Sequence, residues 1–233
     1  MPAGQVEGLQ GMMGGKRSGM VWRVALFAAV LAVSQTIAFH GQHGVSGVTK
    51  AWAAQNFADA GAFLADLSQR ATVELNESGL SEDEKQRRFR VLLNEGFDVA
   101  AIGRFVLGRY WRGASDAERK EFLRTFEDML VFRFLPILGD YTGDTLQVDT
   151  VRPFAETSNI YSVESELKRK SGPPVRLDWR VHQGDAGYRI LDVVAEGVSV
   201  AVTLRSEYNS VLKRNGGKVS ELIATLRKMV AGL

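Results

Sequence analysis

Apolar positions in the first half of the chain recur at helical spacing. Apolar residues return every three or four positions from Phe57 to about Leu138, which predicts amphipathic helices. Ser-x-x-Glu sequences begin at Ser81 and at Ser115, and this spacing is typical of a capping box at a helix N-terminus. The second of these sequences opens a long, phenylalanine-rich helix that we expect to end near Pro136.

The pattern changes to alternation in the second half. Polar and apolar residues alternate between residues 145 and about 201, most clearly in Val-Arg-Leu-Asp-Trp-Arg-Val at 175–181. Gly-Asp-Ala-Gly at 184–187 predicts a turn that returns the chain as a paired strand. Helical spacing resumes after Val198 and is interrupted by a glycine pair that starts at Gly216.

The N-terminal region has the pattern of an export signal. Lys16 and Arg23 precede an uncharged apolar run at 24–33, and small residues follow up to Ala53. Such a pattern with an Ala-x-Ala site is typical of a secretory signal peptide, and cleavage after Ala53 is favoured over a site near Ala38. A membrane anchor is the alternative. A spanning helix needs about 20 predominantly apolar residues, however, and Gly, Ser, Gln and His dilute the second half of the uncharged stretch.

These patterns predict an α+β fold, with helices on either side of an antiparallel meander in the chain. We divide the chain into a signal peptide at 1–53 and one domain at 54–233. Within that domain we expect a helical part at 57–138, a sheet at 145–201 and closing helices at 203–231. The alternation identifies an apolar sheet face that the helices can cover, and it leaves open whether a cavity remains between them.

Charge and cysteine content exclude several classes of protein. Residues 1–54 contain four basic groups and one acidic group, so the rest of the chain has 25 basic and 26 acidic residues and a net charge of −1. The basic character of the whole chain therefore belongs to the export signal, and we expect no nucleic-acid partner. The chain has no cysteine, which excludes disulfides and a lipid-modified N-terminal cysteine.

Sequence motifs for catalysis are missing. The expected mature chain has one histidine, His182, on the charged side of a predicted strand. It is interpretable as a general base or as a surface histidine, and the second interpretation is favoured because the sequence places no carboxylate beside it. Nucleophile-elbow and phosphate-binding glycine patterns do not occur. We expect no catalytic residue, no metal site and no cofactor.

Two distant segments carry a resemblance to a known family. The first is FDVAAIGRFVLGRYWR at 97–112, and the second is DVVAEGVS at 192–199 followed by TLRSEY at 203–208. Together they resemble the MlaC family of periplasmic phospholipid-binding proteins, including its hopanoid-associated HpnM branch. The resemblance extends from about Phe57 to the C-terminus.

The resemblance implies a fold and a function. The implied fold is a curved, NTF2-like antiparallel sheet packed with a helical part around an apolar cavity. The implied function is periplasmic transfer of phospholipid between membrane complexes, which maintains the lipid asymmetry of the outer membrane. Implied partners are a phospholipid or hopanoid ligand, an inner-membrane ABC transporter with an MCE-domain ring and an outer-membrane lipoprotein complex.

Candidate lipid-binding residues are the aromatic and aliphatic side chains of these segments and of the strand faces. They are Phe105, Leu107, Tyr110, Trp111, Tyr161, Val163, Leu177, Trp179, Val181, Ile190 and Val198. An ordinary packed core is the alternative explanation of the same stripes. Arg104, Arg109 and Arg112 are either solvated or placed at the mouth of a pocket, where a guanidinium binds a lipid phosphate.

Three other functions stay open from the sequence. A hopanoid carrier needs a cavity of a different shape, an NTF2-like enzyme would depend on His182, and a structural periplasmic adaptor would have a filled core. Ser199 follows the turn at Glu196 and Gly197, and we expect it to cap a helix rather than to act as a nucleophile.

Overall fold

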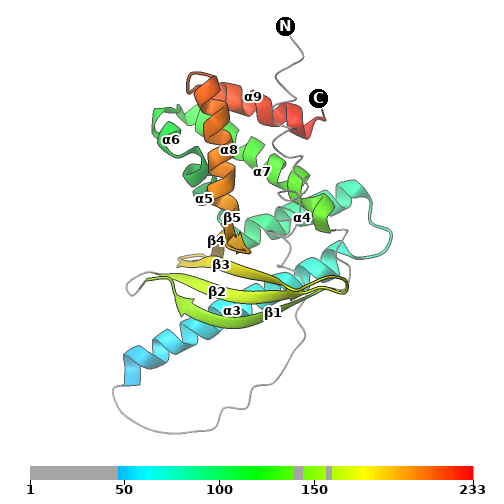
Figure 1. Ribbon diagram of the computed structural model, residues 1–233, viewed down its shortest axis with the longest axis vertical. Helices are drawn as coiled ribbons and strands as arrows, with labels where there is room; N and C mark the ends of the chain where they lie inside the picture. Colours follow the sequence, from blue (N-terminus) through cyan, green and yellow to red (C-terminus); the bar gives the residue numbers. More distant parts are fainter. Residues whose placement is uncertain (1–46, 139–143, 156–158, 233) are drawn as a thin grey trace.

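The computed structural model describes residues 47–138, 144–155 and 159–232 and has the predicted α+β architecture (Figure 1). Helices precede a sheet, and two further helices follow it. The helices are α3 (Gly47–Leu75), α4 (Glu82–Gly96), α5 (Val99–Leu107), α6 (Arg109–Gly113), α7 (Asp116–Leu138), α8 (Val200–Arg214) and α9 (Val219–Val230). The strands are β1 (Thr145–Pro153), β2 (Ile160–Lys168), β3 (Val175–Gly184), β4 (Gly187–Ala195) and β5 (Val198–Ser199).

The five strands form an antiparallel meander in sequence order. The turn predicted at 184–187 is confirmed, since Gly184 pairs with Gly187 across the β3–β4 hairpin. A second two-residue turn joins β4 to β5. Its residues Glu196 and Gly197 have φ of 48° and 80°, the backbone of a type I′ hairpin turn. The Glu196 carboxylate accepts a hydrogen bond from the backbone N–H of Arg176 at 2.8 Å, which holds the non-glycine residue in this conformation.

The two faces of the sheet differ in polarity. Register pairs Val163 with Trp179 and Leu177 with Ala195, and these side chains are all buried on one face. The other face carries charged and hydroxyl side chains that bind one another. Arg180 on that face donates to Ser162 at 2.9 Å and pairs with Asp178 at 2.6 Å.

Helix α3 lies across the sheet and contacts β1 and β2, while α4, α5 and α8 contact β4 (Figure 1). Close approach of α3 to β1 depends on Gly61, because a Cβ there would lie 3.1 Å from a methyl group of Val151. Beyond the short strand β5, α5 and α8 also pack with α7 and α9. In that part Tyr208 meets the rings of Phe122 and Phe126 edge-on, with ring centroids 6.4 and 6.2 Å apart.

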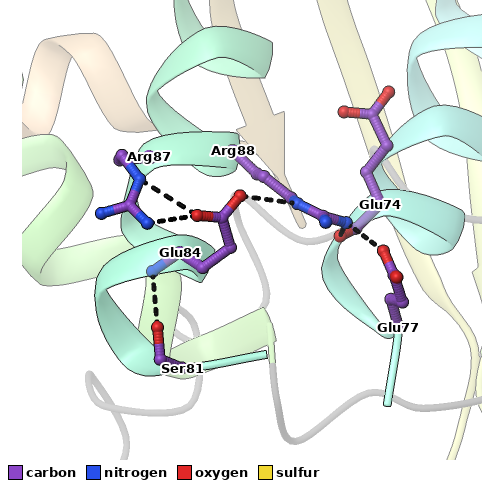
Figure 2. Close-up of polar contacts among 6 residues, drawn as sticks. All are labelled: Glu74, Glu77, Ser81, Glu84, Arg87 and Arg88. Carbon is purple, nitrogen blue, oxygen red and sulfur yellow. Dashed lines mark hydrogen bonds and ion pairs between the residues drawn. The ribbon is translucent and has the colours of Figure 1, made fainter. Parts of the chain in front are cut away.

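The two predicted capping boxes have different outcomes. At α7 the box is complete, since Ser115 accepts from the N–H of Glu118 at 3.2 Å and Glu118 accepts from the N–H of Ser115 at 2.9 Å. At α4 only the serine half forms, with Ser81 accepting from the N–H of Glu84 at 3.2 Å. The Glu84 carboxylate binds Arg87 and Arg88 instead, as Figure 2 shows. Guanidinium groups one helical turn away therefore compete for the carboxylate that the box requires.

The corner between α3 and α4 is held by the same cluster (Figure 2). Arg88 donates to the backbone carbonyl of Glu74 at 2.9 Å and forms an ion pair with Glu77. These contacts join the end of α3 to α4 across the intervening loop. The predicted end of α7 near Pro136 needs a small correction, because the helix includes that proline and ends at Leu138.

None of the helices in the described part of the chain combines the length and the apolarity needed to cross a bilayer. The predicted signal peptide, residues 1–53, lies mostly outside the described residues, which begin at the first turn of α3. The predicted cleavage after Ala53 stays a prediction.

Candidate functional site

The apolar face of the sheet brings together most of the candidate lipid-binding residues. Those on it are Tyr161 and Val163 from β2, Leu177, Trp179 and Val181 from β3, and Ile190 from β4. Each of these side chains is at most 7% exposed. The alternation in the sequence therefore identified one continuous surface built from three adjacent strands.

Polar atoms on this face are paired with one another. The indole N–H of Trp179 donates to the hydroxyl of Ser165 at 2.9 Å, and both side chains are buried. Burying such groups without a partner costs free energy, so the pairing leaves a surface that can face hydrocarbon without penalty. Ser165 was missing from the candidate residues because a serine within an apolar stripe carries no distinguishing signal in the sequence.

Helix α3 supplies the opposite wall. Ala60 and Leu64 are fully buried, and the Gly61 Cα faces the methyl groups of Val148 and Val151. Phe63 packs at the edge of the same surface, with its ring centroid 5.9 Å from that of Tyr188. Ala60, Phe63 and Leu64 fit the helical spacing of apolar residues that begins at Phe57, which predicts the apolar side of a helix and not a site. Their spacing showed that they face an apolar surface but not which one.

Aromatic rings gather at one end of the sheet face. Tyr188 lies between Phe63 and Tyr161, and the two tyrosine ring centroids are 6.1 Å apart. Burial raises the pKa of both tyrosine hydroxyls, so both stay protonated at physiological pH. The Tyr161 hydroxyl reaches the side chain of Gln183 at 3.4 Å. This end of the apolar face therefore carries both tyrosine side chains.

The remaining candidates lie elsewhere, on the α5–α6 segment and on β5. Leu107 is fully buried among the helices, and Tyr110 and Trp111 are partly buried. Phe105 and Val198 are instead exposed, at 42% and 41%. The candidates thus form one group on the sheet face and a second, scattered group in which Leu107 is buried among the helices while Phe105 and Val198 are exposed.

Phe105 and Trp111 line a groove of about 560 Å³ together with four arginines. They are Arg104, Arg109, Arg112 and Arg205, and the other lining residues are Ala101, Phe105, Gly108 and Trp111. Gly108 separates α5 from α6 with φ of +59°, so the segment bends here instead of continuing as one helix. Three of these arginines were noted in the sequence. Arg205 was not assigned to the same surface because it lies on α8, far along the chain.

A small cavity of about 10 Å³ lies between α7, α8 and α9, and it has room for about one water molecule. Arg133 and Glu207 form an ion pair beside it at 3.2 Å. The Tyr208 hydroxyl is buried there without a hydrogen-bond partner among the described residues, and burial raises its pKa strongly. A cavity of this size cannot hold a lipid.

His182 has a carboxylate neighbour that sequence reasoning missed. Its Nε2 lies 3.3 Å from Oδ2 of Asp98, a distance that fits an ion pair when the imidazole is protonated. Asp98 also caps α5, accepting from the N–H of Ala101 at 2.8 Å, and its own N–H donates to the carbonyl of Ile190 at 3.0 Å. Asp98 thus joins the start of α5 to β3 and β4, which is a structural role.

Ser199 caps α8 as predicted, accepting from the N–H of Val202 at 3.0 Å. It also donates to Asp192 at 2.5 Å, and the same carboxylate accepts from the N–H groups of Val193 and Ala201, each at 2.9 Å. Burial raises the pKa of Asp192 despite these hydrogen bonds, which act in the opposite direction. Asp192 therefore ties β4 to the first turn of α8.

Comparisons with known proteins agree on this architecture. The chain is 22% identical over 149 residues to the intermembrane phospholipid transport system binding protein MlaC of Haemophilus influenzae, covering 62% of this chain and 69% of that protein. Its fold is similar to that of the phospholipid-binding protein from Ralstonia solanacearum, solved in complex with a phospholipid. That match has a TM-score of 0.67 at 20% identity and covers 75% of this chain and 98% of the other.

The sequence model of one protein family, described as MlaC protein, matches residues 65–228. The match begins within α3, spans the whole sheet and ends within α9. It includes both segments that carry the resemblance seen in the sequence. The chain therefore belongs to the MlaC protein family.

Proposed function

We propose that this protein is a periplasmic carrier that moves phospholipid between membranes, with the acyl chains held against the apolar face of the sheet. As a member of the MlaC family it is a binding and transport protein rather than an enzyme. The relative from Haemophilus influenzae is named for intermembrane phospholipid transport, and the structural neighbour from Ralstonia solanacearum was solved with a phospholipid bound. Both support a phospholipid as the cargo.

The observation that carries the proposal is the wide apolar face of the sheet beneath α3. Val163, Trp179, Val181 and Ile190 are each fully buried, and the Trp179 N–H is already bound. A ligand on this surface needs no hydrogen bonds along its length, which suits an acyl chain. Removing a chain from water stabilises the complex by about 0.8 kcal/mol per CH₂ group, so a diacyl lipid gains ample affinity from burial alone.

Binding on this face requires α3 to move. In the structure Ala60, Gly61 and Leu64 occupy the space next to β1 and β2 that acyl chains would take. An acyl chain would replace the contacts between α3 and the sheet, so the lost protein contacts offset much of the gain from burial. A carrier benefits from this balance because it must release its cargo as well as hold it.

The proposed place of work is the periplasm, with two membrane complexes as partners. The resemblance to the MlaC family implies an inner-membrane ABC transporter with an MCE-domain ring on one side and an outer-membrane lipoprotein complex on the other. In this scheme the protein performs no chemistry, and its cargo moves according to the relative affinities of the two partners. Maintenance of outer-membrane lipid asymmetry is the expected result.

Native mass spectrometry of the protein purified from the periplasm, followed by lipid extraction, tests this proposal. We expect a bound diacyl phospholipid at near one-to-one stoichiometry. A bound hopanoid would assign the protein to the hopanoid carriers instead. A protein without lipid, and with no uptake from added phospholipid vesicles, would contradict the carrier function and favour a structural adaptor.

A further inference from the structure

The arginine groove on the helical part lacks the ion pairs found elsewhere on the surface. Arg88, Arg90 and Arg133 each bind carboxylates, as most described arginines on the helices do. In contrast, the four arginines of the groove have no carboxylate partner within residues 47–138, 144–155 and 159–232. The reason is visible in the sequence, because residues 99–115 contain three arginines and no acidic residue. Four positive charges are therefore left available to an external anion.

The groove is built to hold some of these guanidinium groups in place. Arg205 lies over the ring of Phe105, with 4.8 Å between its Cζ and the ring centroid. Its guanidinium also rests against Gly108, where an added Cβ would lie 3.1 Å from Nη2. Arg109 stacks on Tyr110 at 4.8 Å and donates to its hydroxyl at 2.8 Å. Aromatic stacking orders these side chains without neutralising them, which leaves their outward N–H groups free to bind.

Exposed apolar side chains lie beside the charges. Phe105 borders the groove at 42% exposure. Val202 is 55% exposed and precedes Arg205 by three positions on α8, so the two side chains are neighbours on the helix surface. Val198, 41% exposed, leads into the same helix. An exposed surface that combines arginines with aromatic and aliphatic groups is amphipathic in the manner of interfacial segments.

We propose that this face, formed by α5, α6 and the first half of α8, docks the protein onto the surface of an anionic phospholipid membrane. The guanidinium groups bind lipid phosphates, and Phe105 and Val202 enter the boundary between headgroups and acyl chains. Charge complementarity favours this occupant, because the rest of the expected mature protein is net negative and only a localised basic face can approach such a surface. An acidic protein would satisfy the arginines but would not require exposed aliphatic groups beside them.

Docking of this kind goes beyond cargo binding and does not depend on what the sheet face holds. The test is co-flotation of the purified protein with vesicles of phosphatidylcholine containing 30% phosphatidylglycerol, chosen as a roughly one-third anionic surface. The triple variant Arg104→Gln/Arg109→Gln/Arg112→Gln removes three groove charges. Each basic group near an anionic surface contributes about fivefold to binding, so we expect removal of three groups to lower the vesicle affinity on the order of a hundredfold.

The matched control is Lys168→Gln/Lys170→Gln/Arg176→Gln, which removes the same charge from exposed positions at the end of β2, in the β2–β3 loop and on β3. We expect this control to bind anionic vesicles nearly as well as the unaltered protein, and Phe105→Ser to bind more weakly and with greater salt sensitivity. The proposal would be overturned if both triple variants lost vesicle affinity equally. It would also be overturned if the unaltered protein bound vesicles of pure phosphatidylcholine as well as anionic vesicles. The protein could instead fail to bind vesicles but bind immobilised polyglutamate. If only the groove variant then lost polyglutamate binding, the face would be assigned to an acidic protein instead. Lipid content by mass spectrometry reports separately on the carrier function.

Discussion

At the scale of single residues, a few buried or capping side chains connect elements that the sequence separates. Asp192 is the clearest, since its carboxylate accepts from Ser199, Val193 and Ala201 and so fixes α8 to the sheet. Desolvation by burial raises its pKa above the ordinary value of 3.8. Its ionisation therefore opposes folding even though the carboxylate is well hydrogen-bonded, and this has a consequence for stability at different pH values.

We expect Asp192→Asn to gain stability relative to the unaltered protein as pH rises from about 3.8 through the folded-state pKa. In that interval the folded protein binds a proton at Asp192 more strongly than the unfolded chain does, so the stability of the unaltered protein falls with rising pH. An asparagine oxygen still accepts from Val193 and Ala201, and its amide can donate to Ser199. Urea unfolding between pH 3.5 and 7 measures the difference. The same series on Asp185→Asn, exposed in the β3–β4 turn, controls for loss of a charge. If the stability of Asp192→Asn relative to the unaltered protein stayed constant or fell as pH rose, Asp192 ionisation would not oppose folding.

The complete capping box at α7 gives a second residue-scale prediction. Ser115→Ala removes the acceptor for the N–H of Glu118 and should lower the free energy of unfolding by about 1 kcal/mol. Hydrogen bonds from Ser115 lower the pKa of Glu118 below 4.5, so this contribution is present above pH 4.5 and is lost as pH falls through the folded-state pKa. Chemical denaturation at pH 7 and at pH 3 measures both effects. Ser210→Ala, at a partly exposed serine within α8 whose hydroxyl only donates to the carbonyl of Ser206, should change stability by about a few tenths of a kcal/mol.

At the scale of elements, contact between helices depends on small residues at close approaches. Gly103 on α5 faces α7, and a Cβ added there would lie 2.7 Å from a methyl group of Leu123 and 3.3 Å from the ring of Phe126. Gly61 has the same role where α3 crosses β1. Both glycines lie within helices, where glycine is otherwise unfavourable, so their presence is explained by packing and not by local conformation.

Gly103→Ala should lower the free energy of unfolding by about 1–3 kcal/mol, because the added methyl group forces Leu123 and the neighbouring phenylalanines to shift. The matched control is Gly113→Ala at the end of α6, where nothing lies within 4 Å of the added Cβ. We expect that control to be neutral or slightly stabilising, since alanine favours a helix. Thermal unfolding of Gly103→Ala, Gly113→Ala and the unaltered protein measures these differences in stability. Equal stability of the two variants would show that the α5–α7 contact adapts without cost.

At the scale of the whole molecule, the two candidate surfaces lie on different parts of the fold. The apolar face is the inner side of the sheet beneath α3, whereas the arginine groove is on the outer side of α5, α6 and α8. Figure 1 shows α3 along the sheet and α5, α6, α8 and α9 gathered beyond β5. Cargo binding and membrane docking are thus assigned to separate surfaces, and each can be altered without the other.

The proposed movement of α3 leads to a prediction about a disulfide. In Gly61→Cys/Val151→Cys the new Cβ at 61 lies 3.1 Å from the position of a Val151 methyl group, which suits a disulfide between α3 and β1. No native cysteine competes with it. We expect the oxidised protein to take up no lipid from vesicles, and the reduced protein to take it up, as measured by native mass spectrometry. Gly61→Cys alone controls for the substitution. Uptake by the oxidised protein equal to that of the reduced form would exclude this route of entry.

The sequence by itself determined the features that depend on local spacing. Alternation identified the apolar side of β2, β3 and β4, and Ser115 and Ser199 were identified as caps because a cap needs only its own helix. The β3–β4 turn followed from its two glycines. These features are fixed within a few residues of the chain, where periodicity and backbone preference act directly.

Only the tertiary structure decided which distant residues meet. It placed Asp98 beside His182, seated Arg205 over Phe105 and laid α3 on β1 and β2. It also gave the Glu84 carboxylate to two arginines instead of the backbone. The physical reason is that an amphipathic pattern states which side of an element is buried but not against what. The partner is settled by how all the elements pack together, and that depends on shape and charge across the whole domain.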